Sequence, residues 1–387
     1  MGLVPFPRRL LVISHTAHYK NSDGRIVGFG ATVDELSHLA SLFEELIHIA
    51  PLHSSPPSGE ALPYAAANVR FVPVKPSGGT GIIKKMAIPV WWIQYWQVIS
   101  HELHKVDAVH VRAPANIALL AMILLMLRKH PSYRWFKYAG NWLLEGKQAW
   151  SYRVQRWLLY KGYPGGWVTR NGQSPDDPPH VIPFYNPSFS QIYLDNIRPL
   201  VVRKTLQWPL RLIYVGRIER AKGIHIALDV VTKCAEQWDV VWDVVGEGKW
   251  LEWLREEVKR RHLNEVVRIH GSLPRPKVFQ LYTSAHFMLL PTASEGWPKV
   301  LSEAMAHGVV PLTNAVSSIP EMLESFGIGA AVKDNRPAAY LDLIHAYLAS
   351  SWRWKQERDK AIQIARKFTY ESYLAAVRAL FKGKLVH

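Results

Sequence analysis

Several features that often identify a protein's function are missing from this sequence of 387 residues. It holds one cysteine, Cys234, so no disulfide can form within the chain, and a reducing compartment fits best. No apolar run reaches the roughly 20 residues that span a bilayer. The longest, Ile117–Leu127, is predicted to be a buried helix. The first residues do not follow a signal-peptide pattern, so we expect an unprocessed cytoplasmic protein.

Metal and dinucleotide sites are also disfavoured. The 17 histidines include no H-E-x-x-H motif, and there are no paired cysteines, so we expect neither a metal nor another cofactor. Gly28 and Gly30 precede the first long predicted helix and are candidates for a loop that approaches phosphate. They do not complete a G-x-G-x-x-G fingerprint, and the acidic residue expected about 20 positions later is absent.

Positive charge and tryptophan are abundant. The chain has 47 Lys and Arg against 31 Asp and Glu, a net charge of +16, and 16 tryptophans. The electrostatic field of this positive charge favours binding of polyanions, which include nucleic acid, an anionic membrane surface and phosphorylated ligands. A predicted helix over Ile88–His104 carries Trp91, Trp92 and Trp96 just after Lys84 and Lys85. This helix either packs its aromatic face on a core or anchors the protein at a membrane interface.

Strand-like and helix-like segments alternate through both halves, which predicts an α/β protein with parallel sheets. The length suggests two domains. We predict two facing Rossmann-like doubly wound domains with a cleft between them, where ligands bind beyond the carboxyl ends of the strands. The predicted boundaries are 1–190, 205–365 and a terminal helix within 366–387 that returns to the first domain. In the first half a long amphipathic helix is predicted over Thr32–Ile49.

Three predicted strand exits in the second half carry glycine. Gly216 follows a buried strand and permits a tight exit, while Arg217 and Lys222 provide charge for a diphosphate. Gly246 ends the next strand and lets the backbone approach a ligand. Leu273 lies in a turn after the third strand that either offers backbone groups to a base or is a plain turn.

The most informative segment runs from Glu295 to Glu303. It places two carboxylates eight residues apart at the start of a predicted helix, with Gly296, Trp297 and Val300 between them. Free N–H groups at a helix start attract phosphate, and carboxylates accept hydrogen bonds from sugar hydroxyls. Together they suggest a nucleotide sugar. The separation along a helix, about 12 Å, disfavours a glycosidase, whose paired carboxyls lie about 5 Å apart in retaining enzymes.

In the first half, His110 and Arg112 share one face at the end of a predicted strand. Facing a cleft, Arg112 would bind phosphate or an acidic acceptor. The alternative is a surface ion pair.

With these residues in view, the segment from Arg211 to Leu323 resembles the retaining family-4 glycosyltransferases, which have the GT-B fold. The likeness rests on G-R-x4-K-G at Gly216–Gly223, on V-G-E-G and above all on E-x7-E with its E-G-W-P start. It is weaker over the first half, where H-V-R-A-P-A-N at 110–116 is similar to the family. Many members carry a histidine near the catalytic centre where this chain has Arg112.

The resemblance implies transfer of a sugar from a nucleotide-diphospho-sugar to a hydroxyl acceptor with retention of configuration. Arg217 and Lys222 would hold the diphosphate, Glu295 the donor sugar and Glu303 the ribose, and the amides of Gly296 and Trp297 would contact sugar or phosphate. The expected acceptor is a lipid-linked or cell-envelope glycan at the inner face of the membrane. The alternatives are a nucleotide-sugar epimerase of the same fold and a non-catalytic binder of polyanions or membranes.

Overall fold

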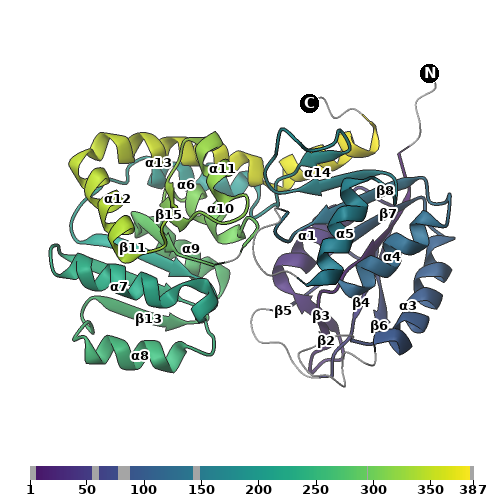
Figure 1. Cartoon of the computed structure of the whole chain (residues 1–387), viewed down its shortest axis with the longest axis horizontal. Helices are drawn as coiled ribbons and strands as arrows, with labels where there is room; N and C mark the ends of the chain where they lie inside the picture. Colours follow the sequence, from purple (N-terminus) through teal and green to yellow (C-terminus); the bar gives the residue numbers. More distant parts are fainter. Residues whose placement is uncertain (1–5, 55–60, 77–87, 143–148, 294, 384–387) are drawn as a thin grey trace. The chain divides into compact units, whose positions relative to one another are not determined.

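The computed structural model describes residues 6–54, 61–76, 88–142, 149–293 and 295–383 (Figure 1). The chain divides into two compact units, one formed by Met1–Tyr185 with Tyr373–His387 and the other by Asn186–Ser372. Each unit is described by itself.

A parallel sheet of seven strands forms the centre of the N-terminal unit among the described residues. Its order is β10-β9-β8-β7-β1-β4-β6. The strands are β1 (Arg9–Ile13), β4 (Glu45–Pro51), β6 (Val69–Val74), β7 (Ala108–Ala113), β8 (Tyr133–Tyr138), β9 (Trp167–Arg170) and β10 (Val181–Pro183). A small antiparallel sheet joins β2 (His18–Lys20), β3 (Ile26–Phe29) and β5 (Ala61–Pro63).

Helices cover both faces of this sheet, because its central strands are apolar on both sides. The helices are α1 (Gly30–Ala40), α3 (Ile88–Leu103), α4 (Asn116–Met126), α5 (Trp150–Tyr160) and the last one, α14 (Tyr370–Phe381). Leu11 and Ile13 of β1 pack with residues of α3 and α4. Leu10 and Val12 pack on the opposite face with residues of α1 and of α14. Successive side chains of one strand therefore fill two separate cores.

The long helix predicted over Thr32–Ile49 is wrong in its second half. Helix α1 ends at Ala40, and β4 begins at Glu45, where it pairs in parallel with β1. Leu36, Leu39, Phe43 and Leu46 fit a helical spacing, which hid the boundary. The β-branched Ile47 and Ile49 are both fully buried in the sheet, where such side chains pack well.

The tryptophan-rich helix α3 packs mainly on the core. Tyr95 is buried, and Trp91 and Trp92 are partly buried against the same cluster, while the ring of Trp96 is 41% exposed. Lys84 and Lys85 lie outside the described residues. No helix within the described ranges is long and apolar enough to cross a bilayer.

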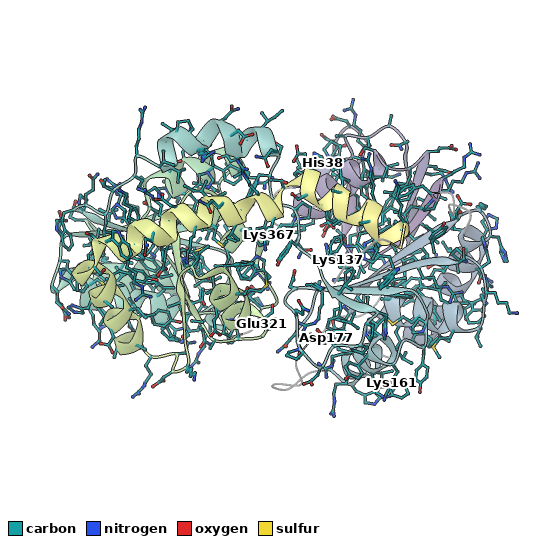
Figure 2. All side chains as sticks on the ribbon, turned by 90° about the horizontal axis from the view of Figure 1, so that it is seen from above. His38, Lys137, Lys161, Asp177, Glu321 and Lys367 are labelled. Atoms are coloured by element: carbon teal, nitrogen blue, oxygen red, sulfur yellow. The ribbon has the colours of Figure 1, made fainter. Side chains whose placement is uncertain are left out.

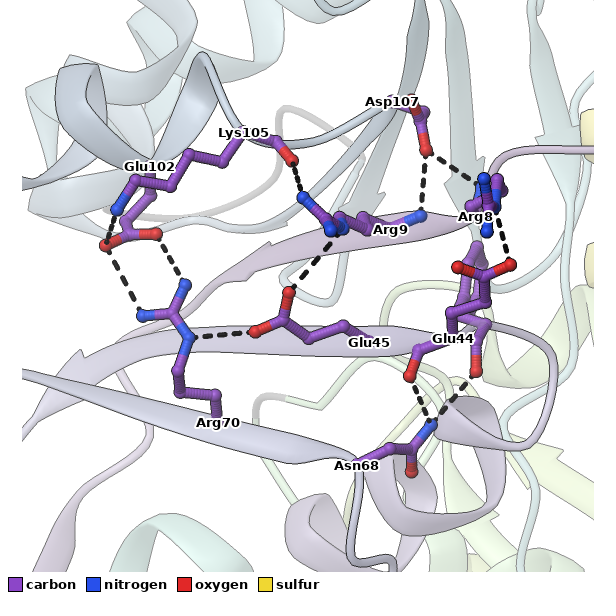
Figure 3. Close-up of polar contacts among 10 residues, drawn as sticks. Arg8, Arg9, Glu44, Glu45, Asn68, Arg70, Glu102, Lys105 and Asp107 are labelled. Atoms are coloured by element: carbon purple, nitrogen blue, oxygen red, sulfur yellow. Dashed lines mark hydrogen bonds and ion pairs between the residues drawn. The ribbon is translucent and has the colours of Figure 1, made fainter.

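Charged side chains tie together the amino ends of the strands (Figure 3). The backbone N–H groups of Arg8 and Arg9 both donate to one carboxylate oxygen of Asp107, each at 2.9 Å. Arg70 links β6 to the buried carboxylate of Glu102 at 2.7 Å and to Glu45 at 2.9 Å. Burial opposes ionisation of Glu102, but the hydrogen bonds from Arg70 and Lys105 outweigh it and lower its pKa. These charges hold the fold at the edge opposite to the carboxyl ends.

The C-terminal unit is built on a second parallel sheet, of six strands in the described chain, in the order β13-β12-β11-β14-β15-β16. The strands are β11 (Leu210–Val215), β12 (Val240–Val245), β13 (Val267–Gly271), β14 (Phe287–Leu290), β15 (Val310–Asn314) and β16 (Ala330–Val332). The helices are α6 (Gln191–Val201), α7 (Ile224–Ala235), α8 (Leu251–Arg260), α9 (Arg275–Ser284), α10 (Lys299–Ala306), α11 (Ile319–Phe326), α12 (Pro337–Ala349) and α13 (Ser351–Ala365), with short 3₁₀ turns at Arg220–Lys222 and Arg366–Phe368.

Both sheets reverse their winding next to their first strand. In the N-terminal unit the order runs from β1 outward to β4 and β6, then resumes on the other side at β7. In the C-terminal unit it runs from β11 to β12 and β13, then resumes at β14. Crevices at the carboxyl ends of strands beside such switch points are where open α/β sheets bind ligands.

Candidate active site

Four loops at the carboxyl ends of the C-terminal sheet are joined by backbone hydrogen bonds. Gly216 N–H donates to Val245 at 3.0 Å, which ties the loop after β11 to the end of β12. Gly246 N–H donates to Gly271 at 2.8 Å, which ties β12 to β13, and Ala293 N–H donates to Ala221 at 2.9 Å, which ties the loops after β14 and β11. The loops around the switch point therefore form one connected surface.

Glycine is required where these loops touch, as Gly246 and Gly223 show. A Cβ on Gly246, whose φ is +139°, would lie 1.9 Å from the carbonyl oxygen of Gly216. A Cβ on Gly223, whose φ is +75°, would lie 2.0 Å from the carbonyl oxygen of Pro291. By contrast, a Cβ on Gly216 would meet only the ring and hydroxyl of Tyr214, at 3.7 Å or more. Gly246 and Gly223 therefore hold backbones together.

Lys222 and Glu295 meet across the switch point. Lys222 ends the 3₁₀ turn after β11, and Glu295 follows β14, the strand on the other side of the switch. The ammonium of Lys222 donates to Oε1 of Glu295, and the two side chains are 17% and 26% exposed. The two residues predicted to contact the donor's diphosphate and its sugar are thus neighbours, and both are accessible to a ligand.

Arg217 lies on the same loop as Lys222, and its side chain is more exposed to solvent. Its side chain is 69% exposed and is 3.3 Å from Glu219. Its carbonyl oxygen accepts a hydrogen bond from the buried hydroxyl of Tyr214 at 2.8 Å, which fixes the backbone at this point. Burial and then the nearby Glu295 raise the pKa of Tyr214, so its hydroxyl stays a donor. Arg217 can therefore turn toward an anion while its backbone stays in place.

The helix after Glu295, α10, begins at Lys299. Pro298 precedes the first turn of α10, so Glu295 lies in the preceding loop and Glu303 in the helix. One side of α10, which includes Leu301, is buried in the core, while Val300 is half-buried. Trp297 is buried: its indole N–H donates to Ser302 Oγ at 2.8 Å, and its ring stacks on Phe368. Its side chain is part of the core, so only its backbone can contact a ligand.

Glu303 has a partner that sequence reasoning missed. Nη2 of Arg275, the first residue of α9, donates to its Oε1 at 3.1 Å, and the Glu303 side chain is 13% exposed. Burial opposes the charge on Arg275, but Glu303 and Tyr370 raise its pKa. Arg275 follows Leu273 and Pro274 in a segment that we assigned to a turn, and no sequence pattern connected it to Glu303. Leu273 itself is half-buried after β13.

The N-terminal unit has a pocket of about 490 Å³ beside its own switch point. Ser14, His15 and Thr16 line it from the end of β1, Arg112 and Ala113 line it from β7, and Phe29 and Thr32 line it beside the start of α1. This pocket contains one of the predicted site residues, Arg112.

Arg112 belongs to a buried charge cluster, not to a surface ion pair. Oε1 of Glu35, in α1, accepts from Arg112 at 2.8 Å and from Lys137 of β8 at 2.7 Å. The hydroxyl of Tyr373, in α14, is 3.2 Å from the same oxygen. Burial lowers the pKa of His15 in the same pocket, and the charge of Arg112 lowers it further. The floor of the pocket is therefore cationic and rigidly held.

Gly28 and Gly30 lie in regular elements and not in the predicted loop, and their approach to phosphate stays a prediction. Gly28 lies in strand β3, opposite His18, and a Cβ there would be 2.5 Å from the imidazole of His18. Gly30 is the buried first residue of α1. The β2–β3 hairpin lies between β1 and this point of the chain, and Gly30 opens the first helix. The pairing between these short strands was not visible in the glycine spacing.

His18 belongs to a buried hydrogen-bonded chain under the pocket. Nδ1 of His18 donates to the carbonyl of Thr16 at 2.8 Å, and its Nε2 accepts from the hydroxyl of Tyr64 at 2.8 Å. Tyr64 accepts from Nδ1 of His48 at 2.6 Å, and Nε2 of His48 accepts from Ser14 Oγ at 2.8 Å. Burial lowers the pKa of His18 to about 4, which keeps its ring neutral and fixes these directions.

Comparison with known proteins agrees with this arrangement. Residues 206–368 match the family model described as "Glycosyl transferases group 1". A putative colanic acid biosynthesis glycosyltransferase, WcaL of Escherichia coli K12, is 31% identical over 146 residues, 36% of each chain. The amylovoran biosynthesis glycosyltransferase AmsK of Erwinia amylovora is 28% identical over 132 residues, 32% of each chain. The alignments thus span about a third of the length of these relatives.

Solved structures extend the likeness to the whole fold. HepE of Anabaena, solved with UDP and glucose, superposes with a TM-score of 0.66 at 15% identity, covering 95% of this chain and 98% of that one. Sucrose-phosphate synthase of Thermosynechococcus elongatus gives 0.68 at 14% identity, covering 97% and 98%. The chain therefore has two Rossmann-like units of the kind found in GT-B glycosyltransferases, and its residues 206–368 are similar to group 1 glycosyl transferases.

Proposed function

We propose that this protein transfers a sugar from a nucleotide-diphospho-sugar to a hydroxyl acceptor, with retention of configuration and without a metal. The observation that carries the proposal is the Lys222–Glu295 pair at the switch point of a group 1 glycosyl transferase domain. A cation and a carboxylate side by side match the two parts of such a donor, its diphosphate and its sugar hydroxyls.

The proposed chemistry follows from where charge develops. When the bond between the sugar's anomeric carbon and the diphosphate breaks, negative charge grows on the leaving phosphate oxygens. Lys222 and the exposed Arg217 would neutralise that charge, and fixed cations of this kind act mainly on the transition state. Glu295 would turn from Lys222 to the sugar hydroxyls as the donor binds. Glu303, held by Arg275, would accept from the ribose.

The acceptor side is proposed from the N-terminal pocket and from the relatives. Arg112 and His15 line that pocket, and we propose that an acceptor hydroxyl binds there. The names of two relatives refer to colanic acid and amylovoran biosynthesis. We therefore propose a lipid-linked or cell-envelope glycan as acceptor, with the protein at the inner membrane surface.

The first test is nucleotide binding. UDP, GDP and ADP are screened by thermal shift, and the preferred one raises the melting temperature because it binds only the folded state. Lys222→Met removes the shift, whereas Lys233→Met, an exposed lysine at the end of α7, keeps it. If no nucleoside diphosphate stabilises the protein, a non-catalytic binder replaces the transferase.

The second test is turnover with the preferred donor. We expect Glu295→Ala to lower transfer of a labelled sugar by at least about a hundredfold, because the donor sugar is no longer oriented. The circular dichroism spectrum and the melting temperature without ligand should stay close to those of the parent. Full turnover in Glu295→Ala would contradict the assignment. An altered sugar formed without any acceptor would instead identify an epimerase.

A further inference from the structure

A second large pocket lies in the N-terminal unit, away from β1 and β7. It has a volume of about 720 Å³, within the range of small-molecule sites. Its walls come from α5, from Trp142 after β8, and from the loop after β9 that holds Ser174, Asp176 and Asp177. In Figure 2 the labels of Asp177 and of Lys161, the residue after α5, mark this part of the unit. The candidate active site uses none of these residues.

Aromatic rings dominate the rim. The side chains of Trp150 and Trp157 are 74% and 51% exposed, and Tyr160 is exposed at the end of the same helix. Trp150 and Trp157 are seven residues apart, two helical turns, so both lie on one side of α5. Core packing does not explain rings that are half or more in water. Rings in this arrangement offer flat apolar faces to a ligand.

The floor is rigid and already formed. Asp177 accepts from the indole N–H of Trp142 at 3.1 Å, from the N–H of Ser174 at 2.8 Å and from the guanidinium of Arg170 at 2.5 and 2.9 Å. Tyr138 packs edge-on against the ring of Trp142 at 5.2 Å. A preformed floor avoids the entropy that a loose loop would lose on binding.

Charges of both signs line the pocket. Arg153 and Arg156 lie there with Asp176 and Asp177, and Asp177 is also paired with Arg170, so the local excess is one positive charge in a chain whose net charge is +16. Because carboxylates lie among the guanidinium groups, the pocket offers an anionic membrane or a polyanion no surface of a single positive sign. A neutral ligand rich in hydroxyl groups uses both signs, because it donates to Asp176 and accepts from Arg153. Both of these side chains are exposed.

We propose that this pocket, the α5 pocket, binds a segment of neutral oligosaccharide. The face of a pyranose ring carries C–H groups that pack on an indole, while its edge carries hydroxyls that hydrogen-bond to charged side chains. Two tryptophans two turns apart suit a chain of sugars better than one. The α5 pocket thus holds a glycan chain outside the pocket that Arg112 and His15 line. The proposal does not depend on sugar transfer, because a protein without transferase activity would still bind the glycan here.

The test measures binding of defined neutral glycans to the full chain. Cellohexaose, maltohexaose and laminarihexaose are titrated by calorimetry, and we expect at least one of them to bind. Trp157→Ala and Trp150→Ala should each weaken that binding by about tenfold, equivalent to about 1.4 kcal/mol. Trp352→Ala removes an indole that is 66% exposed in the other unit and should leave binding unchanged.

Two further measurements distinguish glycan binding in the α5 pocket from nucleotide binding and from membrane binding. The thermal shift by nucleoside diphosphate should be the same in Trp150→Ala and Trp157→Ala as in the parent, so the two proposals fail independently. Three results would overturn the oligosaccharide assignment: no heat with any of the glycans, glycan binding that survives both tryptophan substitutions, or capture by anionic phosphatidylglycerol vesicles that these substitutions abolish.

Discussion

Glu35 organises the N-terminal pocket at the scale of single residues. Its side chain is 1% exposed, and its carboxylate lies between Arg112 and Lys137, which come from two neighbouring strands. A buried carboxylate with two cations is stable only while the set is complete, because each ion has lost its water. The cluster therefore fixes Arg112 where the pocket needs it.

Replacing Glu35 by glutamine should be strongly destabilising. Glu35→Gln keeps the shape but leaves two buried cations beside a neutral amide, and we expect a loss of about 3–5 kcal/mol in the free energy of unfolding. Glu45→Gln is the matched control: Glu45 also lies between two arginines, but it is 33% exposed. The free energy of unfolding of Glu45→Gln should fall by less than about 1 kcal/mol. Urea titrations followed by tryptophan fluorescence measure both; equal losses would show that burial does not set the strength of the cluster.

Sequence reasoning reached only part of this residue-level chemistry. Lys222 was found because it follows a recognisable strand and Gly216, and Glu295 because it follows a recognisable strand and precedes Gly296. Arg112 was found as a strand-end cation, but its partner Glu35 lies 77 residues earlier in a helix, where it looks like any surface acid. Arg275, the partner of Glu303, was missed for the same reason. A pairing between distant segments becomes visible only when the fold brings them together.

At the scale of elements, close backbone packing positions the candidate donor site. The loops after β11 and β12 touch where Gly246 meets the carbonyl of Gly216. The Arg217 backbone is tied to the same contact, because Ile218 N–H donates to Glu247 at 2.8 Å. Anything that separates these loops should therefore move the residue proposed to hold the diphosphate.

Gly246→Ala tests this packing. The new Cβ would clash with backbone that cannot give way cheaply, so we expect a loss of about 1–3 kcal/mol in stability and weaker nucleoside diphosphate binding. Gly271→Ala is the matched control, because its φ of +68° brings backbone strain while a Cβ there meets open space. Gly271→Ala should lower the free energy of unfolding by about 1 kcal/mol and leave nucleotide binding unchanged. Melting temperatures measured with and without nucleotide distinguish the two variants. If Gly246→Ala and Gly271→Ala shift equally on binding nucleotide, the contact between the loops does not position the donor site.

Strands were predictable where they are mostly apolar, as in β12 (Val240–Val245) and β14 (Phe287–Leu290), because the sequence alone indicates a strand over each of these ranges. The boundary inside Thr32–Ile49 was lost because one apolar spacing runs through both a helix and a strand. The three short strands β2, β3 and β5 were missed because each is only three or four residues long. Their pairing depends on tertiary contacts that a local pattern does not contain.

At the scale of the whole molecule, both units carry buried neutral histidines. Burial lowers the pKa of His18 in the N-terminal unit to about 4, and it does the same for His286 and His307 in the C-terminal unit. His307 is fixed from both sides, since Nδ1 donates to the Glu303 carbonyl at 2.7 Å and Nε2 accepts from Tyr193 at 2.7 Å. Below neutral pH these rings oppose folding, on top of the repulsion within a chain of net charge +16.

The sign of this effect predicts a loss of stability in mild acid. The folded pKa of His307, about 4, lies below its ordinary value of 6.5, so the unfolded chain binds more protons between these values. Stability is therefore complete above about pH 6.5 and falls by about 1.4 kcal/mol per pH unit for each such histidine, levelling below about pH 4. In urea titrations between about pH 7.5 and 5, His307→Gln should flatten the slope for the C-terminal unit by that amount. His104→Gln, at an exposed position, should not change the slope. A parent protein equally stable across this range would show that the buried rings accept protons without cost.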